Sequence, residues 1–253
     1  MSAQITVNDL TMAYGSFVVM HDLNFEIADK QIFVIMGGSG CGKSTLLRHL
    51  IGLQEPAKGS IIYDGKNFTA TAPADRQPFI KRFGVMYQSG ALWSSLTLGE
   101  NISMPIEESG KLPAKTVRDL VSYKLSLVGL SGYEDYYPSQ ISGGMKKRAG
   151  IARAMALDPD ILFLDEPGAG LDPLSARRLD DLILRLRDSL GSMIVIVTHE
   201  LASIFNIADQ ALFLDTATRT QGALGNPNDL RDHSDNPTVR LFLNRGEIPN
   251  SPL

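Results

Sequence analysis

The stretch "QIFVIMGGSGCGKSTLLRHL", residues 31–50, joins an apolar run to a glycine-rich loop and then to a helical pattern. The run "IFVIM" (32–36) predicts a buried strand, and the leucines that follow the loop predict a helix over 43–53. The loop between them fits G-x-x-x-x-G-K-[ST], a motif that requires this strand, loop and helix order. The stretch therefore predicts an α/β fold built around a phosphate-binding loop.

The loop has the chemistry that phosphate binding needs. Glycines let backbone N–H groups curl around an anion, and the helix N-terminus adds positive potential. We expect Lys43 to reach the β- and γ-phosphates and the Ser44 hydroxyl to bind Mg²⁺. Cys41 is expected to be a small loop residue and not a nucleophile. The predicted cofactor-binding residues of the loop are Gly37, Gly38, Ser39, Gly40, Cys41, Gly42, Lys43, Ser44 and Thr45.

A second apolar strand, in "ILFLDEPGAGLD" (161–172), ends in two carboxylates. We expect Asp165 to hold the magnesium and Glu166 to polarise the attacking water as a general base. Two further residues are weaker candidates for the same site, and they are considered only because the phosphate loop is present. Gln88 in "VMYQSG" is expected to touch the magnesium or the water, and His199 in "MIVIVTHE" to contact the γ-phosphate.

The pattern around these motifs alternates between strands and helices. Strands are expected before residue 36 and over 59–66, where the last ends in an Asp-Gly turn. From about 89 to 157 the periodicity is helical, and strands then return on either side of a helix predicted over 175–190. This order predicts a parallel sheet with helices on its faces, interrupted by a helical insert.

Composition limits the classes of function. Of 253 residues 43% are hydrophobic, and the net charge of -4 argues against a nucleic-acid binder with a broad basic face. The single cysteine excludes an internal disulfide and fits a reducing compartment. The apolar runs are too short to cross a bilayer and no secretory signal is expected, so a membrane role requires a partner.

The stretch "ISGGMKKRAGIARA" (141–154) contains a second candidate anion site. Ser142 and two glycines open a predicted helix, whose N-terminus favours an anion. The structural alternative is an amphipathic helix that Ser142 merely caps. The first phosphate loop already serves one nucleotide, so this site raises the question of whose phosphate it binds.

In order along the chain, "AYG" with Tyr14, "GGSGCGKST", "MYQSG", "ISGGMKKR", "ILFLDEP", "GLD" and "VTHE" resemble the nucleotide-binding subunit of ATP-binding cassette (ABC) systems. The resemblance covers about residues 1–225. It implies an ATPase with ATP and Mg²⁺ as cofactors. It also implies one domain with a P-loop NTPase (RecA-like) core, an antiparallel β subdomain and an α-helical subdomain inserted at about 89–157, followed by a tail at 226–253.

The resemblance also assigns residues. Tyr14 would stack on adenine, and Asp172 would lie where two nucleotide domains meet. In the family two copies pack head to tail, so Ser142, Gly143 and Gly144 would bind the γ-phosphate held by the second copy. Met145 departs from the glutamine that usually follows, and the next residues are basic here. This departure leaves the serine and glycine contacts intact.

Three stretches narrow the resemblance to the ATPases of MCE-type (Mla-like) lipid transport systems: "SGGM" with its basic residues, "YQSGALWSSLTLGENI" (87–102) and "NPTVRLFLNRG" (236–246). The subgroup implies an integral-membrane permease, an MCE-domain protein and phospholipid movement between the inner and outer membranes. It places the ATPase on the cytoplasmic face of the inner membrane.

Two other functions stay open at this point. An ATPase of a small-solute transporter would share every catalytic motif. A soluble ABC ATPase acting on ribosomes, DNA or iron–sulfur assembly is disfavoured by the single cassette and the acidic charge. Trp93 has two interpretations, lining a permease groove or core packing. The tail has two as well, contact with a neighbouring ATPase or accessory protein, or a loosely packed end.

Overall fold

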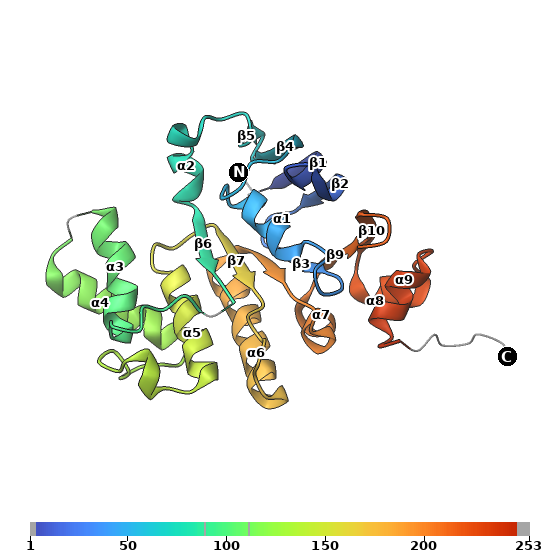
Figure 1. Ribbon diagram of the computed structural model, residues 1–253. Helices are drawn as coiled ribbons and strands as arrows, with labels where there is room; N and C mark the ends of the chain where they lie inside the picture. The colour runs from blue at the N-terminus through green and yellow to red at the C-terminus, as the bar shows by residue number, and fades with distance from the viewer. Residues whose placement is uncertain (1–3, 89, 111, 247–253) are drawn as a thin grey trace. The chain divides into compact units, whose positions relative to one another are not determined.

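The computed structural model describes residues 4–88, 90–110 and 112–246 (Figure 1). The chain divides into two compact units. Unit 1 consists of the residues up to Ile80 together with those from Met193 onward, and unit 2 consists of Lys81–Ser192.

Unit 1 contains an antiparallel sheet in the order β2 (Phe17–Ile27), β1 (Ile5–Tyr14), β4 (Lys58–Tyr63) and β5 (Lys66–Asn67). β4 and β5 are joined by Asp64 and Gly65, whose φ angles are both positive, 49° and 75°. Two positive φ angles suit the tight hairpin turn that Asp-Gly favours. The predicted strand and Asp-Gly turn are therefore confirmed.

A second set of strands in unit 1 runs in the order β10 (Thr220–Gly225), β9 (Gln210–Asp215), β3 (Ile32–Met36) and β8 (Met193–Val197). β3 is parallel to both β8 and β9, whereas β10 is antiparallel to β9. Every residue of β3 and β8 is buried, as continuous apolar runs of parallel strands require. The helices α1 (Lys43–Leu50) and α7 (Leu201–Ile207) belong to the same unit.

The chain after β10 forms two short helices, α8 (Pro227–His233) and α9 (Pro237–Leu243), which pack on each other and on β10 (Figure 1). Each begins with a proline after a capping asparagine, Asn226 or Asn236. Val239 and Leu243 are buried, so the loosely packed end that one interpretation expected is wrong as far as Leu243. The last part of the predicted tail, 247–253, lies outside the described residues.

Two short elements complete unit 1, the 3₁₀ helix η1 (Pro73–Asp75) and α2 (Gln77–Ile80). Beside them Tyr63, Phe68 and Phe79 form an aromatic cluster, and the buried Arg76 guanidinium lies 4.7 Å from the centroid of the Phe68 ring. Because Tyr63 is the last residue of β4, this cluster packs at the end of that strand.

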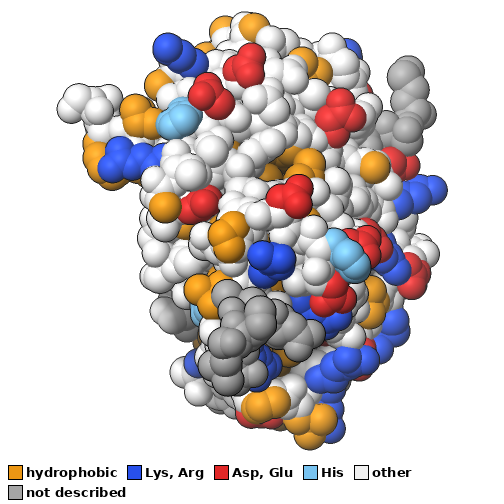
Figure 2. Space-filling model, turned by 90° about the vertical axis from the view of Figure 1, so that its right-hand side faces the viewer, with side chains coloured by type: hydrophobic (Ala, Val, Ile, Leu, Met, Phe, Trp, Pro, Cys, Tyr) orange, Lys and Arg blue, Asp and Glu red, His pale blue; other side chains and the backbone are white. Residues whose placement is uncertain are grey.

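In the view of Figure 2, acidic and basic side chains are intermixed, and no broad basic face appears there.

Among its described residues, unit 2 contains two parallel strands, β6 (Phe83–Met86) and β7 (Ile161–Asp165), and four α-helices. These are α3 (Leu98–Ser109), α4 (Ala114–Leu127), α5 (Gly143–Ala154) and α6 (Pro173–Leu190), with a 3₁₀ turn η2 (Pro138–Gln140) before α5. α3, α4 and α5 pack on one another, and α5 also packs on β6 and α6. The helical periodicity predicted after residue 89 is confirmed.

α5 lies close to β6 because Gly84 has no side chain. A Cβ there would lie 2.3 Å from the Ala154 carbonyl oxygen.

No helix in the described ranges is both long and apolar enough to span a membrane.

Candidate functional site

The phosphate loop of unit 1 depends on its glycines. Gly37 has φ +147°, and a Cβ there would lie 2.7 Å from the Leu214 carbonyl oxygen. Gly42 has φ +96°, and its Cβ would lie 2.9 Å from Val19. No side chain caps α1 and its first turn has no acidic residue. An anion at the start of α1 would lie at the positive end of the helix dipole, with no acidic residue of that turn to oppose it.

Lys43 is buried at the start of α1, and its Nζ donates to the carbonyl oxygens of Gly37 and Gly38, both at 3.0 Å. The same ammonium lies 4.0 Å from the Cys41 Sγ. Burial raises the pKa of the Cys41 thiol, and the nearby ammonium offsets this only in part. Cys41 is therefore a buried, protonated loop residue, as expected, and a poor nucleophile.

Tyr14 ends β1, and the residue is 49% exposed. The Thr45 hydroxyl is the largest cause of a lowered Tyr14 pKa, and Arg48 acts in the same direction. Tyr14 thus lies against the first two turns of α1. The structure brings an exposed aromatic ring to the helix that starts at the phosphate loop.

His199 also lies near this loop within unit 1. β3 and β8 are parallel, with Ile35 opposite Val197, and the Thr198 N–H donates to the Ile35 oxygen at 3.2 Å. Because the carboxyl ends of parallel neighbours meet at one edge, His199 follows β8 at the edge where the phosphate loop follows β3. Its side chain is more than half exposed there.

The other candidate residues gather at the corresponding edge of unit 2. Met86 of β6 lies opposite Leu164 of β7, so Gln88 follows one of two neighbouring parallel strands, and Asp165 and Glu166 lie at the end of the other. Gln88 is exposed, whereas Asp165 and Glu166 are 9% and 8% exposed. Glu166 has a left-handed backbone, with φ +48°. Non-glycine residues with such a backbone are strained, and they cluster at functional sites.

Lys147 was not among the predicted site residues, yet it contacts two of them. Its buried Nζ donates to the backbone oxygen of Gln88 and, at 3.1 Å, to that of Glu166. Burial lowers the Lys147 pKa, and the carboxylates of Glu166 and Asp165 partly offset that effect. In the sequence Lys147 is only one of several basic residues after Met145, so nothing marks it as special.

Asn101 is a second residue that sequence analysis missed. It is fully buried, and its Oδ1 accepts from the Trp93 N–H at 2.7 Å. Its Nδ2 donates to the carbonyl oxygens of Trp93, Leu96 and Thr97 at 3.1, 3.1 and 2.8 Å. These bonds fix the loop that precedes α3. On this loop Trp93 is 55% exposed, so the core-packing interpretation of Trp93 is wrong.

The stretch with the second anion site forms the N-terminus of α5. The Ser142 Oγ accepts from the Met145 N–H at 3.3 Å, so the capping part of the structural alternative is confirmed. Packing does not explain the two glycines. A Cβ on Gly143 would meet nothing within 4 Å, and one on Gly144 would make only ordinary contacts from 3.8 Å. Glycine weakens a helix, so helix stability does not explain these two residues either.

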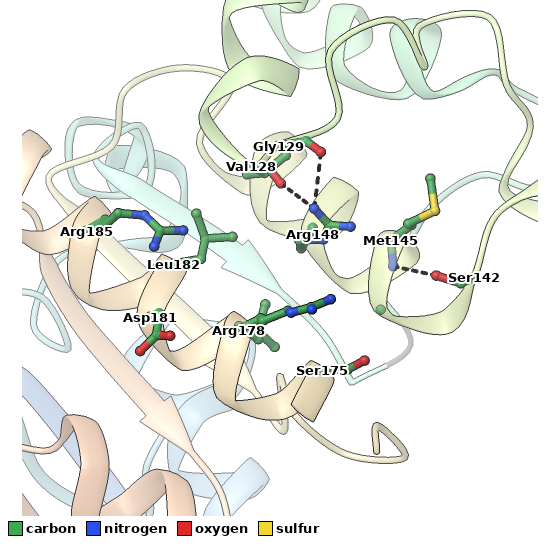
Figure 3. Close-up of a pocket in the computed structure, with 12 residues that line it drawn as sticks. Val128, Gly129, Ser142, Met145, Arg148, Ser175, Arg178, Asp181, Leu182 and Arg185 are labelled. Atoms are coloured by element: carbon green, nitrogen blue, oxygen red, sulfur yellow. Dashed lines mark hydrogen bonds between the residues drawn. The ribbon is translucent and has the colours of Figure 1, made fainter. Parts of the chain in front are cut away.

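A groove of about 420 Å³ runs from this N-terminus along α5 and α6 (Figure 3). Its lining includes Ser142 and three arginines, of which Arg148 donates to the carbonyl oxygens of Val128 and Gly129 at 3.0 and 3.2 Å. Val128 is the C-cap residue of α4 and Gly129 follows it, so Arg148 of α5 caps the C-terminus of α4. These hydrogen bonds connect α4 to α5.

Asp172 has a local role as the N-cap of α6. Its Oδ1 accepts from the backbone N–H groups of Leu174 and Ser175 at 3.1 and 3.0 Å. A hydrogen bond from the Ser175 side chain lowers the pKa of the Asp172 carboxyl group most, and the bonds from the Ser175 and Leu174 backbones act in the same direction. The carboxylate therefore stays ionised at the positive end of α6.

The donor set fits a magnesium nucleotide. Magnesium prefers a few oxygen ligands and completes its shell with water and phosphate oxygens. The described residues hold no group of three or more His, Cys, Asp or Glu side chains that would bind a metal alone. The Ser44 hydroxyl in unit 1 and the buried Asp165 carboxylate in unit 2 are each an oxygen donor of the kind that magnesium prefers.

Comparisons with known proteins agree with this chemistry. Residues 20–169 match the family model described as "ABC transporter". The probable ribonucleotide transport ATP-binding protein mkl of Mycobacterium tuberculosis is 40% identical over 248 residues, which cover 98% of this chain and 68% of that protein. The intermembrane phospholipid transport system ATP-binding protein MlaF of Escherichia coli is 36% identical over 239 residues, covering 94% of this chain and 88% of MlaF.

A solved structure has the same fold. The ATP-binding cassette MJ0796, in a dimeric post-hydrolysis state bound to ADP and Pi, matches with a TM-score of 0.79 and 24% identity. The match covers 88% of this chain and 98% of that one. It confirms the P-loop NTPase fold, and the family match confirms ATP and Mg²⁺ as cofactors. The chain belongs to the ABC transporter family and is an ATP-binding subunit with ATPase activity.

Proposed function

We propose that this subunit powers the movement of phospholipids or related lipids between the inner and outer membranes. The observation that carries the proposal is the similarity to MlaF over 94% of the chain, well beyond the motifs that all ABC ATPases share. The permease and the MCE-domain protein are the proposed partners. The chain is proposed to work as a peripheral subunit on the cytoplasmic face of the inner membrane.

The proposed roles of the residues follow the geometry of each unit. Lys43 and the loop amides bind the phosphates, Tyr14 stacks on the base, and His199 senses the γ-phosphate. Ser44, Asp165 and Gln88 hold Mg²⁺, which neutralises charge on the phosphates. Glu166 orients and deprotonates the attacking water.

We propose a head-to-tail pair of copies in which residues 142–144 bind the γ-phosphate of the second copy. Two observations support it: the glycines at 143 and 144 have no packing reason, and MJ0796 forms a dimer. This pairing answers whose phosphate the second site binds. ATP then holds the two copies together, hydrolysis releases them, and Asp172 lies at their interface. Residues 1–225 act as one ATPase domain, with 226–253 as an appended tail.

A second substrate class has support from the mycobacterial relative, whose name describes ribonucleotide transport. The two classes share the catalytic residues, so only the partners and the cargo separate them. The experiment is a pull-down with tagged Glu166→Gln, which binds ATP and is expected to lose turnover. The variant is trapped with ATP in the native membrane and purified in mild detergent.

Mass spectrometry then identifies what co-purifies with the variant. A permease with an MCE-domain protein and bound phospholipid would support lipid transport. A permease with bound nucleotides or a solute-binding protein would favour small-solute transport instead. Recovery without any membrane protein would refute both transport proposals, and normal turnover of Glu166→Gln would refute the general-base role.

A further inference from the structure

Residues on one side of α5 contact the segment that follows β6. Lys147 donates to the Gln88 oxygen, and Arg153 Nη1 donates to the Ala91 oxygen at 2.9 Å. Between them, Gly150 allows close packing, since a Cβ there would lie 2.9 Å from the Gly90 oxygen. The three positions are spaced three residues apart, so they share one side of the helix. α5 therefore contacts the backbone of residues 88, 90 and 91.

The same lysine also holds the end of β7. The Glu166 oxygen accepts from Lys147 Nζ at 3.1 Å and from the Ala169 N–H at 3.2 Å. Glu166 has φ +48°, a left-handed backbone that is unfavourable for a residue with a side chain. Such strain persists only where surrounding contacts enforce it. A buried ammonium on the Glu166 carbonyl is one of these contacts.

The geometry points to Lys147 of α5 as a positioning residue that fixes the backbones of Gln88 and Glu166 together. The ammonium touches the backbones of the two residues and lies beside β7, so it acts through them. An ammonium has three N–H donors, so a single lysine side chain can reach both carbonyl oxygens. A glutamine side chain at position 147 would be shorter. The inference rests on the proposed roles of Gln88 and Glu166.

The test compares Lys147→Met, Lys147→Arg and a matched control, Lys146→Gln. Methionine keeps the length and loses the donors, and arginine keeps the charge and the donors. The control removes a positive charge from the neighbouring position of the same helix. Hydrogen-exchange mass spectrometry on nucleotide-free protein reports the amides of Gly90 and Ala169, which bond to the Tyr87 and Glu166 oxygens at 2.7 and 3.2 Å.

We expect Lys147→Met to speed exchange at both amides, with arginine restoring protection and the control unchanged. In ATPase assays kcat falls about 10- to 100-fold, the scale of a small misplacement of reacting groups, while KM for ATP changes less than about twofold. Unchanged exchange in Lys147→Met, an equal effect in the control, or faster exchange throughout unit 2 would overturn the inference. So would a normal kcat in Lys147→Met.

Failure of the proposed function gives a different result. If wild type hydrolyses ATP and Glu166→Gln does so equally well, the assigned role of Glu166 is wrong. Faster exchange at Gly90 and Ala169 in Lys147→Met would still support the contact itself. The exchange experiment therefore tests the lysine, and the Glu166→Gln comparison tests the site.

Discussion

Ser142→Ala separates a helix cap from a contact with the second copy's ATP. The Ser142 hydroxyl is exposed and accepts from the Met145 N–H at 3.3 Å, which is long for a cap. Removing an N-cap costs about 0.5–2 kcal/mol, and this geometry belongs at the low end, about 0.5–1 kcal/mol. The melting temperature should fall by only about 1–4 °C.

The effect on pairing should be much larger. A hydrogen bond to a phosphate oxygen contributes about 1.5–3 kcal/mol, and a symmetric pair contains two such sites. The loss of about 3–6 kcal/mol weakens ATP-dependent dimerisation by about 10²- to 10⁴-fold. Sedimentation equilibrium with ATP, in a Glu166→Gln background that prevents hydrolysis, measures this directly.

Thr97→Ala is the matched control. Thr97 caps α3 in the same unit, and its Oγ1 accepts from the Glu100 N–H at 3.2 Å. The Thr97→Ala variant should lose a similar amount of folding stability without any change in ATP-dependent dimerisation. If Ser142→Ala and Thr97→Ala dimerise with the same ATP-dependent affinity, Ser142 is only a cap and the proposed pairing is refuted.

Three further predictions concern the loop, the packing and pH. Lys43→Met should weaken binding of a fluorescent ATP analogue about tenfold or more, and unchanged affinity would contradict the loop assignment. Gly84→Ala should cost about 3 kcal/mol or more in urea unfolding, because its Cβ would lie 2.3 Å from the Ala154 oxygen; Gly110→Ala, with open space, should be near neutral. Burial lowers the His49 pKa, so unfolded chains bind this proton more readily and the free energy of unfolding should fall as pH drops below about 6.5; His49→Gln should flatten that slope.

The surroundings of His49 explain why the free energy of unfolding should fall as the pH drops. Its Nδ1 lies 2.8 Å from the Gln54 oxygen, which accepts from the neutral ring, and its buried Nε2 has no partner among the described residues. A second proton would have to enter this buried position. If the wild-type slope persists in His49→Gln, another group is responsible for it.

The sequence by itself determined the phosphate loop, the two acidic residues at the end of β7 and the serine and glycines at the start of α5. Each is a contiguous motif, because backbone N–H groups that bind a phosphate must come from consecutive residues. The helical periodicity and the buried strands were equally readable, since burial imposes a repeat on nearby residues. The cap at Ser142 and the Asp64-Gly65 turn are local for the same reason.

Only the tertiary structure decided which distant residues support that chemistry. Lys147 reaches the oxygens of Gln88 and Glu166 across 59 and 19 positions of sequence, and Asn101 fixes the loop at Trp93. The structure also decided that the chain packs through Leu243, where composition left the tail open. Such contacts depend on how helices pack against strand ends. A local sequence pattern cannot predict such contacts, because the sequence does not distinguish a buried lysine from an exposed one.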